Sequence, residues 1–206
     1  SRQGLGSIAT LMLNVAAGAF GDAAIAGMSI VTRISFFTYA MVIGLGQGFQ
    51  PLCGFCYGAK LYGRVKEAFF FCIRCGTVFL SVCALLGFIF STSIISIFRD
   101  DAAVVAVGSV ALRWQVLSFP LVASIVLTNM LMQTIRKPVR ANIVAAARSG
   151  LFFIPLIFIL PYYFGLLGVE MCQMWADCCS FAVAVPIAWS AFRDMRREQM
   201  ELGKSQ

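Results

Sequence analysis

Two charged residues lie deep inside long apolar runs of the sequence. They are Arg33 and Asp177, and Asp177 is the only carboxylate well inside such a run. An unpaired charge at the centre of a bilayer costs at least about 2.5–3.5 kcal/mol. We therefore expect both side chains to face a bundle interior or a water-filled cavity, paired with one another or with a neighbour. Asp177 could carry a proton or bind a cation, or it could form an ion pair between helices.

Three further arginines stand nearer the ends of their apolar runs. Arg74, Arg113 and Arg148 each lie within a few turns of a predicted helix end. A long arginine side chain can lay its aliphatic stem along apolar surface while its charge stays in the polar boundary layer. We predict that these three side chains reach the membrane surface in this way.

Amide side chains form another set of candidates, because they hydrogen-bond between helices in lipid and can line a substrate path. They are Asn14, Gln47, Gln50, Gln115, Asn129 and Gln133. Together with methionine and phenylalanine, these amides would give an adaptable, aromatic surface that suits hydrophobic, cationic ligands. Packing between helices is the alternative for each of them. The predicted substrate-cavity residues are Asn14, Arg33, Gln47, Gln50, Asn129, Gln133 and Asp177.

Four cysteines have a spacing that zinc sites use. Cys53-x-x-Cys56 and Cys72-x-x-Cys75 are separated by fifteen residues, a common distance between two zinc-binding pairs. Both pairs are embedded in apolar sequence, where cysteine is an ordinary packing residue, so we predict no metal site. The chain has no histidine for a Ser-His or Cys-His pair and no Walker loop for ATP. We predict no catalytic residues, no cofactor and no enzymatic activity.

The composition indicates which elements position these side chains. The chain is 60% hydrophobic and 12% charged, with a mean hydropathy of +0.88, whereas a soluble domain has about 25% charged residues. A helix of about 20 mostly apolar residues crosses a bilayer. Long runs of this kind predict an all-α polytopic membrane protein with six transmembrane helices and a charged tail. The ranges are 5–20, 23–51, 68–98, 102–133, 141–160 and 166–192 for the helices, and 193–206 for the tail.

The end of the second run has an unusual composition. Residues 44–59, GLGQGFQPLCGFCYGA, contain five glycines, two glutamines and Pro51. Glycine lets helices approach closely in a membrane, and Pro51 removes a helical hydrogen bond. The segment is either a hinged, polar-lined stretch that faces other helices or a helix end with small packing residues.

The basic residues alternate from loop to loop. On one side lie Arg2, then Lys60, Arg64 and Lys66, then Arg136, Lys137 and Arg140, and finally Arg193, Arg196, Arg197 and Lys204. The opposite loops hold Arg99 alone. The positive-inside rule then predicts a cell (inner) membrane protein with both chain ends in the cytoplasm. Because the cations are spread over several loops, we predict no nucleic-acid partner.

Several short motifs follow one another along nearly the whole chain. They are Gly18-Ala-Phe-Gly-Asp22, Arg33-Ile, Gly44…Gln50-Pro51…Gly58-Ala59-Lys60, Arg64-Val-Lys66, Ile97-Phe-Arg-Asp-Asp101, Gln133…Lys137-Pro138, Pro155-Leu-Ile-Phe-Ile-Leu-Pro161, Phe164-Gly165-Leu-Leu-Gly168-Val and Asp177. In this order they resemble the second half of a multidrug and toxic compound extrusion (MATE) transporter, and most of all the bacterial branch that exports drugs. The chain begins with Ser1 and enters an apolar run at once, so we expect a fragment without its N-terminal part.

The resemblance implies one lobe of a twelve-helix transporter made of two six-helix lobes. Its implied partners are the N-terminal lobe, the lipid bilayer, and small-molecule drugs or organic cations, which leave in exchange for Na+ or H+ as one lobe rocks against the other. Some members place coupling carboxylates in the helices that correspond to 5–20 and 102–133, which hold no Asp or Glu here. We therefore expect the coupling ion to bind in the N-terminal half. The family usually has asparagine where this chain has Cys56, which puts a polar role at that position in doubt.

Two other functions stay open. A lipid-linked oligosaccharide flippase shares the broad architecture and would line its cavity with cations, a role that Arg33, Arg74, Arg113 and Arg148 could fill. A membrane scaffold or metal-binding module built on the cysteine pairs is the third hypothesis. Drug efflux, lipid flipping and zinc content would separate the three.

Overall fold

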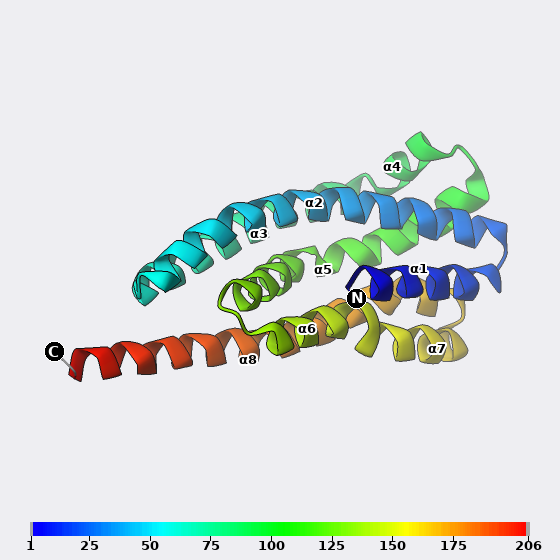
Figure 1. The fold of residues 1–206 in the computed structure, drawn as a ribbon. Helices are drawn as coiled ribbons and strands as arrows, with labels where there is room; N and C mark the ends of the chain where they lie inside the picture. Colours follow the sequence, from blue (N-terminus) through cyan, green and yellow to red (C-terminus); the bar gives the residue numbers. More distant parts are fainter. Residues whose placement is uncertain (1, 205–206) are drawn as a thin grey trace.

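Helices make up nearly all of the chain. The computed structural model describes residues 2–204, and no strand occurs in that range. The elements are α1 (Arg2–Gly18), α2 (Asp22–Gly58), α3 (Tyr62–Ile89), α4 (Ser91–Phe98), α5 (Ala102–Thr134), α6 (Pro138–Ala146), a π-helix (Ala147–Leu151), α7 (Phe153–Phe164) and α8 (Leu166–Lys204), arranged as in Figure 1. The predicted all-α membrane architecture is confirmed: α2, α3, α5 and α8 are long and apolar enough to cross a membrane, and two shorter apolar helices lie in α1 and α7.

Four differences separate the helix boundaries from the predicted runs. The run 141–160 is divided between α6, the π-helix and α7, and the run 68–98 is divided between α3 and α4. Pro51 does not end α2, which continues to Gly58, because a proline removes one hydrogen bond and the neighbouring turns keep theirs. α8 continues through the predicted tail to Lys204, where Arg, Met, Glu and Gln are all good helix formers.

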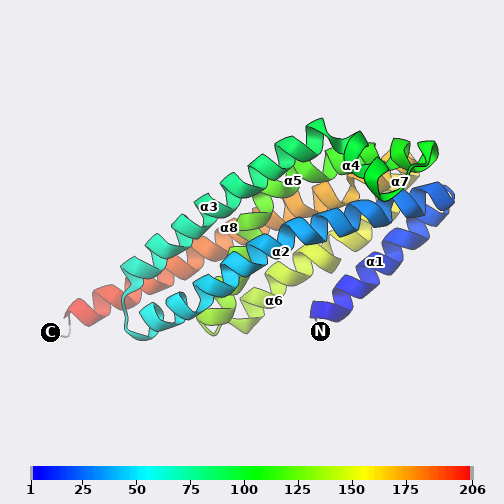
Figure 2. The same cartoon turned by 90° about the horizontal axis from the view of Figure 1, so that it is seen from above.

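α5 is the central helix of the bundle. It packs against α2, α3, α4, α6 and α8, and Figure 2 shows it enclosed by the other helices. Its buried side chains include Leu112, Val122, Ile125 and Leu127, which at 3.6 residues per turn point in several directions around the helix. A helix that is apolar on every side is typical of the centre of a bundle.

A close helix crossing fixes α2 against α5. A Cβ atom on Gly27 would lie 3.1 Å from the backbone nitrogen of Gly108, so the two backbones touch at this point. Small residues are common where membrane helices approach closely. Farther along α2, the same packing brings Tyr39 beside Gln115 of α5.

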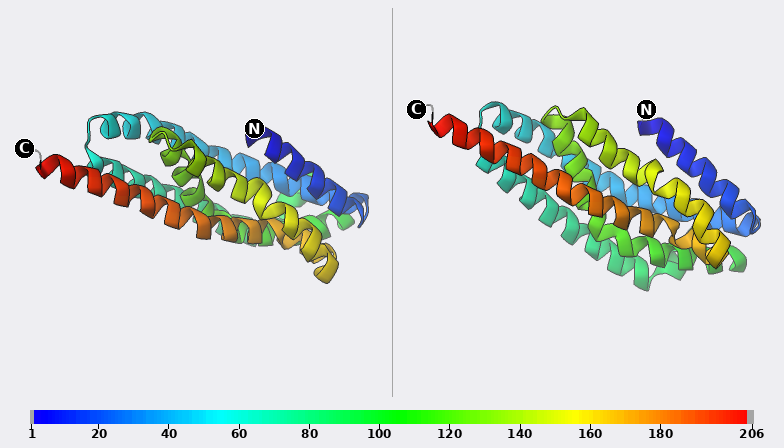
Figure 3. Two further views of the ribbon diagram at one scale, coloured as in Figure 1. Left: turned by 60° about the horizontal axis from the view of Figure 1, so that its bottom comes forward. Right: turned by 90° about the horizontal axis from the view of Figure 1, so that it is seen from below.

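Two tight turns with the same hydrogen-bond pattern end α2 and α5. Lys60 and Arg136 adopt left-handed φ angles of 59° and 57°. In each turn the next amide bonds back five residues, Leu61 N to the Cys56 carbonyl at 2.8 Å and Lys137 N to the Met132 carbonyl at 3.0 Å, which is the pattern of a Schellman helix end. Figure 3 shows both turns at the end of the bundle where α8 terminates, so the predicted basic loops share one end.

Candidate functional site

Polar side chains from four elements meet inside the bundle, among residues that are otherwise apolar. They are Tyr39 of α2, Gln115 and Ser118 of α5, Arg148 of the π-helix, and Gln173 and Asp177 of α8, here called the Asp177 cluster. Residues three or four apart lie on the same face of a helix. α5 and α8 therefore each present two polar groups to the same interior point.

Asp177 is the centre of this cluster and is fully buried. Its Oδ1 accepts hydrogen bonds from Arg148 Nε at 2.9 Å and from Gln173 Nε2 at 3.2 Å. Its Oδ2 lies 2.9 Å from the donating hydroxyl of Ser118. A buried carboxylate is tolerated when a cation pairs with it and donors satisfy its oxygens. The cluster meets both conditions.

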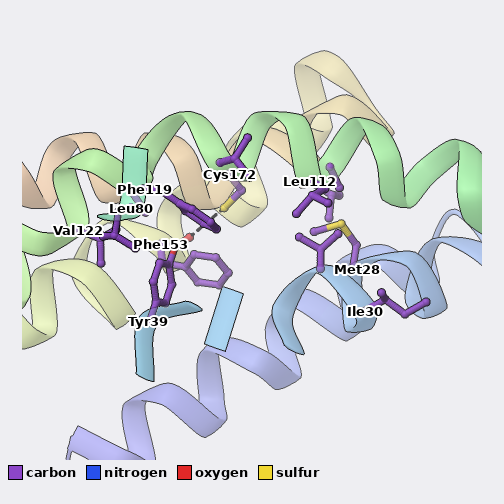
Figure 4. Close-up of a cluster of buried hydrophobic side chains, with 14 of the residues drawn as sticks. Met28, Ile30, Tyr39, Leu80, Leu112, Phe119, Val122, Phe153 and Cys172 are labelled. Atoms are coloured by element: carbon purple, nitrogen blue, oxygen red, sulfur yellow. Dashed lines mark hydrogen bonds between the residues drawn. The ribbon is translucent and has the colours of Figure 1, made fainter. Parts of the chain in front are cut away.

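Tyr39 connects the cluster to α2. Gln115 Nε2 donates to the Tyr39 hydroxyl at 2.8 Å and lies 3.3 Å from Ser118 Oγ. The guanidinium carbon of Arg148 lies 4.6 Å from the centroid of the Tyr39 ring, within the range of a cation–π contact. Tyr39 also packs edge-on against Phe119, and Figure 4 shows these rings beside Phe153 in the core. Tyr39 thus connects the polar cluster to the aromatic part of the core.

The π-helix brings Arg148 to Asp177. It interrupts the helical run between α6 and α7, and Phe152 N bonds back to the Ala147 carbonyl at 3.3 Å. A π turn adds one residue to a helical turn and redirects the side chains, and it is frequent at functional sites. Pro155 follows in the first turn of α7, where its missing N–H leaves the Leu151 carbonyl without its usual partner. The local sequence therefore favours an irregular turn at this position.

The structure corrects one prediction about the charged residues and decides another. The prediction that Arg148 reaches the membrane surface is wrong, because its side chain is mostly buried and pairs with Asp177. Asp177 pairs with this neighbour and not with Arg33, which is exposed on α2. Arg74 and Arg113 are also exposed, and Arg113 Nε donates to Ser91 Oγ at 2.9 Å.

Two predicted cavity residues form a separate contact between α5 and α6. Asn129 Nδ2 donates to the Ala141 carbonyl at 2.6 Å, and Gln133 Nε2 donates to Asn129 Oδ1 at 2.6 Å. Asn129 is buried, whereas Gln133 is exposed. These amides stabilise the junction that follows the Arg136 turn.

The remaining predicted cavity residues lie outside the Asp177 cluster. Asn14 of α1 and Gln50 of α2 are half-buried, and Gln47 and Arg33 are exposed on α2. The structure therefore distributes the predicted set over several places instead of one cavity. Asp177 is the only member of that set in the buried cluster.

Five of the six members of the Asp177 cluster are missing from the predicted substrate-cavity set, although the sequence holds a signal for three of them. Gln115 and Ser118 are three residues apart in one apolar run, and Gln173 and Asp177 are four apart in another. Polar pairs at these spacings share one helix face, which indicates two polar faces that need partners. Tyr39 has no comparable signal, since one tyrosine in an apolar run is typical of packing.

A second buried carboxylate lies near the start of α8. Glu170 is 4% exposed, and the described residues give it no hydrogen bond and no ion pair. Asp177, seven residues farther along the same helix, has three donors. Glu170 is therefore a candidate for a role outside the packing of this bundle, which its position near the helix end did not indicate.

A further ion-pair site lies at the basic end of the bundle. Asp194 Oδ2 accepts from Lys137 Nζ and, at 3.1 Å, from Arg140 Nη1. The Tyr62 hydroxyl donates to Glu198 Oε2 at 2.8 Å. The last turns of α8 are thereby attached to the turn before α6 and to the start of α3.

The cysteine pairs contribute to the apolar core. Cys53, Cys56 and Cys72 are buried in the cluster that contains Phe49 and Leu131. Among the residues that the structure describes, no three His, Cys, Asp or Glu side chains are grouped so as to hold a metal ion. The described geometry gives the zinc hypothesis no support.

Comparison with known proteins gives a family match and several relatives for this chain. The family model described as MatE matches residues 4–159. The multidrug export protein MepA of Staphylococcus saprophyticus is 27% identical over 180 residues, and MepA of Staphylococcus aureus strain N315 is 29% identical over 180 residues. In both comparisons the match covers 87% of this chain and 39% of the relative. The chain thus spans about two fifths of the length of these relatives.

Solved structures share the fold. The MATE transporter VcmN of Vibrio cholerae in its bent form superimposes with a TM-score of 0.88 at 18% identity, over 94% of this chain and 44% of that one. A MOP superfamily transporter from Pyrococcus furiosus gives a TM-score of 0.89 at 17% identity, over 95% of this chain and 44% of that one. Because the MatE model matches most of the sequence, the chain belongs to the MatE family of transporters.

Proposed function

We propose that this chain is the C-terminal six-helix half of a secondary active transporter in the cell membrane. The transporter would export drugs or organic cations in exchange for Na+ or H+ by alternating access. The observation that carries the proposal is the match to two multidrug export proteins, which covers 87% of this chain but only 39% of each relative. The basic loops at one end of the bundle support a topology with both chain ends in the cytoplasm.

The exposed face of α2 is where the other half would pack. Arg33 is exposed in the interior of this long apolar helix, and a charge at that depth is costly against lipid. Gly44 and Gly48 lie on the exposed side, with nothing within 4 Å of an added Cβ, and a Gly-x-x-x-Gly pair allows close contact with another membrane helix. Both features indicate that this face of α2 contacts a protein partner or a water-filled path and not lipid.

The same face carries groups suited to an apolar cation. Phe36, Phe37 and Met41 are 70%, 76% and 55% exposed. Aromatic faces attract cations, and methionine adapts to irregular ligands. In the assembled transporter these side chains and Gln47 would line the space between the two halves.

The Asp177 cluster would hold this half together as one body. Rocking of one half against the other requires each half to move with little internal change. The cluster joins α2, α5, the π-helix and α8 at one buried point. Because Arg148 occupies the carboxylate of Asp177, we propose that the coupling ion binds in the N-terminal half, and the Glu170→Gln variant below tests the other buried carboxylate of this half.

The flippase alternative depends on a cavity lined with cations. Arg148 is paired with Asp177 and is mostly buried, so it is removed from the set of arginines that supported that alternative. Arg33, Arg74 and Arg113 remain exposed. The drug exporter is therefore the better supported of the two functions.

Ethidium efflux tests the proposal in the full-length protein. Proteoliposomes that contain the wild-type protein should extrude ethidium only when a Na+ or H+ gradient is imposed. Glu170→Gln should retain gradient-driven efflux if the coupling carboxylate lies in the other half. Efflux that is unaffected by collapse of both gradients, or flipping of a labelled lipid without ethidium efflux, would overturn the proposed function.

A further inference from the structure

A groove runs between α3 and α8 at the basic end of the bundle. Both helices pack against α5 and make few contacts with each other, and Figure 1 shows α5 between them. The groove has a volume of about 850 Å³ and is floored by Ser124 and Thr128 of α5. Sites of about 300–1,000 Å³ accommodate most small ligands, so this groove is large enough for an extended molecule.

One end of the groove is strongly cationic. Lys66 of α3 and Arg193 and Arg196 of α8 line it, and its lining includes no carboxylate. The ion pairs found among the described residues involve other cations. Three like charges that line one hollow repel each other and attract an anion.

The rest of the groove is apolar and aromatic. Phe70 and Phe192 stack with ring centroids 6.0 Å apart, and Trp189 and Val185 continue the wall along α8. From Arg193 to Phe181, twelve residues of helix extend about 18 Å. The hydrocarbon depth of one leaflet is about 15 Å, half of the bilayer core. The groove therefore matches an acyl chain in length, with its cations at the level of a headgroup.

We propose that this groove binds an anionic phospholipid. The lipid phosphate would contact Lys66, Arg193 and Arg196, and an acyl chain would lie against Phe70, Phe192 and Trp189. Basic pockets between membrane helices on the cytoplasmic side are a recognised mode of binding for anionic headgroups. The proposal does not depend on what the transporter exports, because the groove is lined by α3, α5 and α8 and includes no residue of α2.

Native mass spectrometry of the full-length protein tests the headgroup site. With equal amounts of phosphatidylglycerol and phosphatidylcholine, the wild type should retain phosphatidylglycerol at least about tenfold better, since each cation near an anionic surface contributes appreciably. The triple variant Lys66→Gln/Arg193→Gln/Arg196→Gln should lose this preference. The matched control Lys60→Gln/Arg64→Gln/Arg197→Gln removes the same charge from residues outside the groove and should keep it.

Three results of that experiment would overturn the proposal. They are equal retention of the two lipids by the wild type, an equal loss in the control variant, and displacement of the bound lipid by glycerol phosphate at the same concentration. Thermal unfolding of both triple variants, expected to match the wild type, verifies that a lost preference comes from the groove.

Fluorescence of Trp189 tests the acyl-chain position. The emission that depends on Trp189 is obtained by subtracting the spectrum of a Trp189→Phe variant. Phosphatidylglycerol with brominated chains should quench this emission in vesicles of the full-length protein, and the Lys66/Arg193/Arg196 variant should require at least about tenfold more brominated lipid. No quenching would mean that another part of the protein covers the groove, and the proposal would fail.

Discussion

α8 carries two ion-pair sites that use the same chemistry in different surroundings. Asp177 pairs with Arg148 inside the bundle, where the carboxylate is 0% exposed. Asp194 pairs with Lys137 and Arg140 at the basic end, where its side chain is 34% exposed. Charges attract more strongly in a low dielectric, but removing one partner there leaves the other charge buried and unpaired. The two sites therefore differ in what happens when they are broken.

The comparison also separates two structural roles. The Asp177 cluster joins four elements through charged and neutral hydrogen bonds. The Asp194 site attaches only the end of α8 to the region around α6. Exposed ion pairs contribute about 0–1 kcal/mol to stability. We therefore expect the first site to stabilise the whole bundle and the second to stabilise only the attachment of the end of α8.

Arg148→Leu should have the largest effect on stability. The substitution leaves Asp177 buried without its cation, which costs about 3–5 kcal/mol. Chemical unfolding of the full-length protein in detergent measures this change, and Arg74→Leu, which removes an exposed arginine of α3, is the control. A loss of less than about 1 kcal/mol in Arg148→Leu would show that the buried pair does not hold the bundle together.

Ser118→Ala should have an intermediate effect. It removes the hydroxyl that lies 2.9 Å from Asp177 Oδ2, and loss of one partner from a buried polar group costs about 1–3 kcal/mol. The same unfolding experiment measures it, with Ser109→Ala as the matched control, since the half-buried Ser109 hydroxyl donates to the Ala106 carbonyl of its own helix. Equal stability of the two variants would contradict the assigned hydrogen bond.

Much of the architecture follows from the sequence, because long apolar runs and alternating loop charges are local signals. The run 141–160 holds one local signal of its division, Pro155, but the sequence does not show that the π-helix brings Arg148 to Asp177 of α8. The sequence also does not identify the ion-pair partner of Asp177. Arg33 and Arg148 both lie in apolar runs, and only the helix packing decides which of them contacts the carboxylate. The face of α2 that carries Arg33 and Gln47 is exposed in this half, so its role depends on the part of the transporter that would cover it.

Asp194→Asn should have the smallest effect. The two cations that it releases can be solvated, so the stability loss should be below about 1 kcal/mol. The distance over which salt screens exposed charges falls from about 10 Å at 0.1 M to about 3 Å at 1 M. The loss should therefore shrink further at 1 M NaCl, whereas the loss in Arg148→Leu should change little. Unfolding at two salt concentrations measures both, and an Asp194→Asn loss equal to that of Arg148→Leu would remove the distinction between the sites.

Double-mutant cycles test the distinction most directly. Arg148→Leu, Asp177→Leu and their combination give the coupling energy of the buried pair, and Arg140→Leu, Asp194→Leu and their combination give that of the exposed pair. We predict a coupling energy above about 2 kcal/mol for the buried pair, because the combined variant no longer strands a charge, and below about 1 kcal/mol for the exposed pair. Equal coupling energies at the two sites would contradict the account.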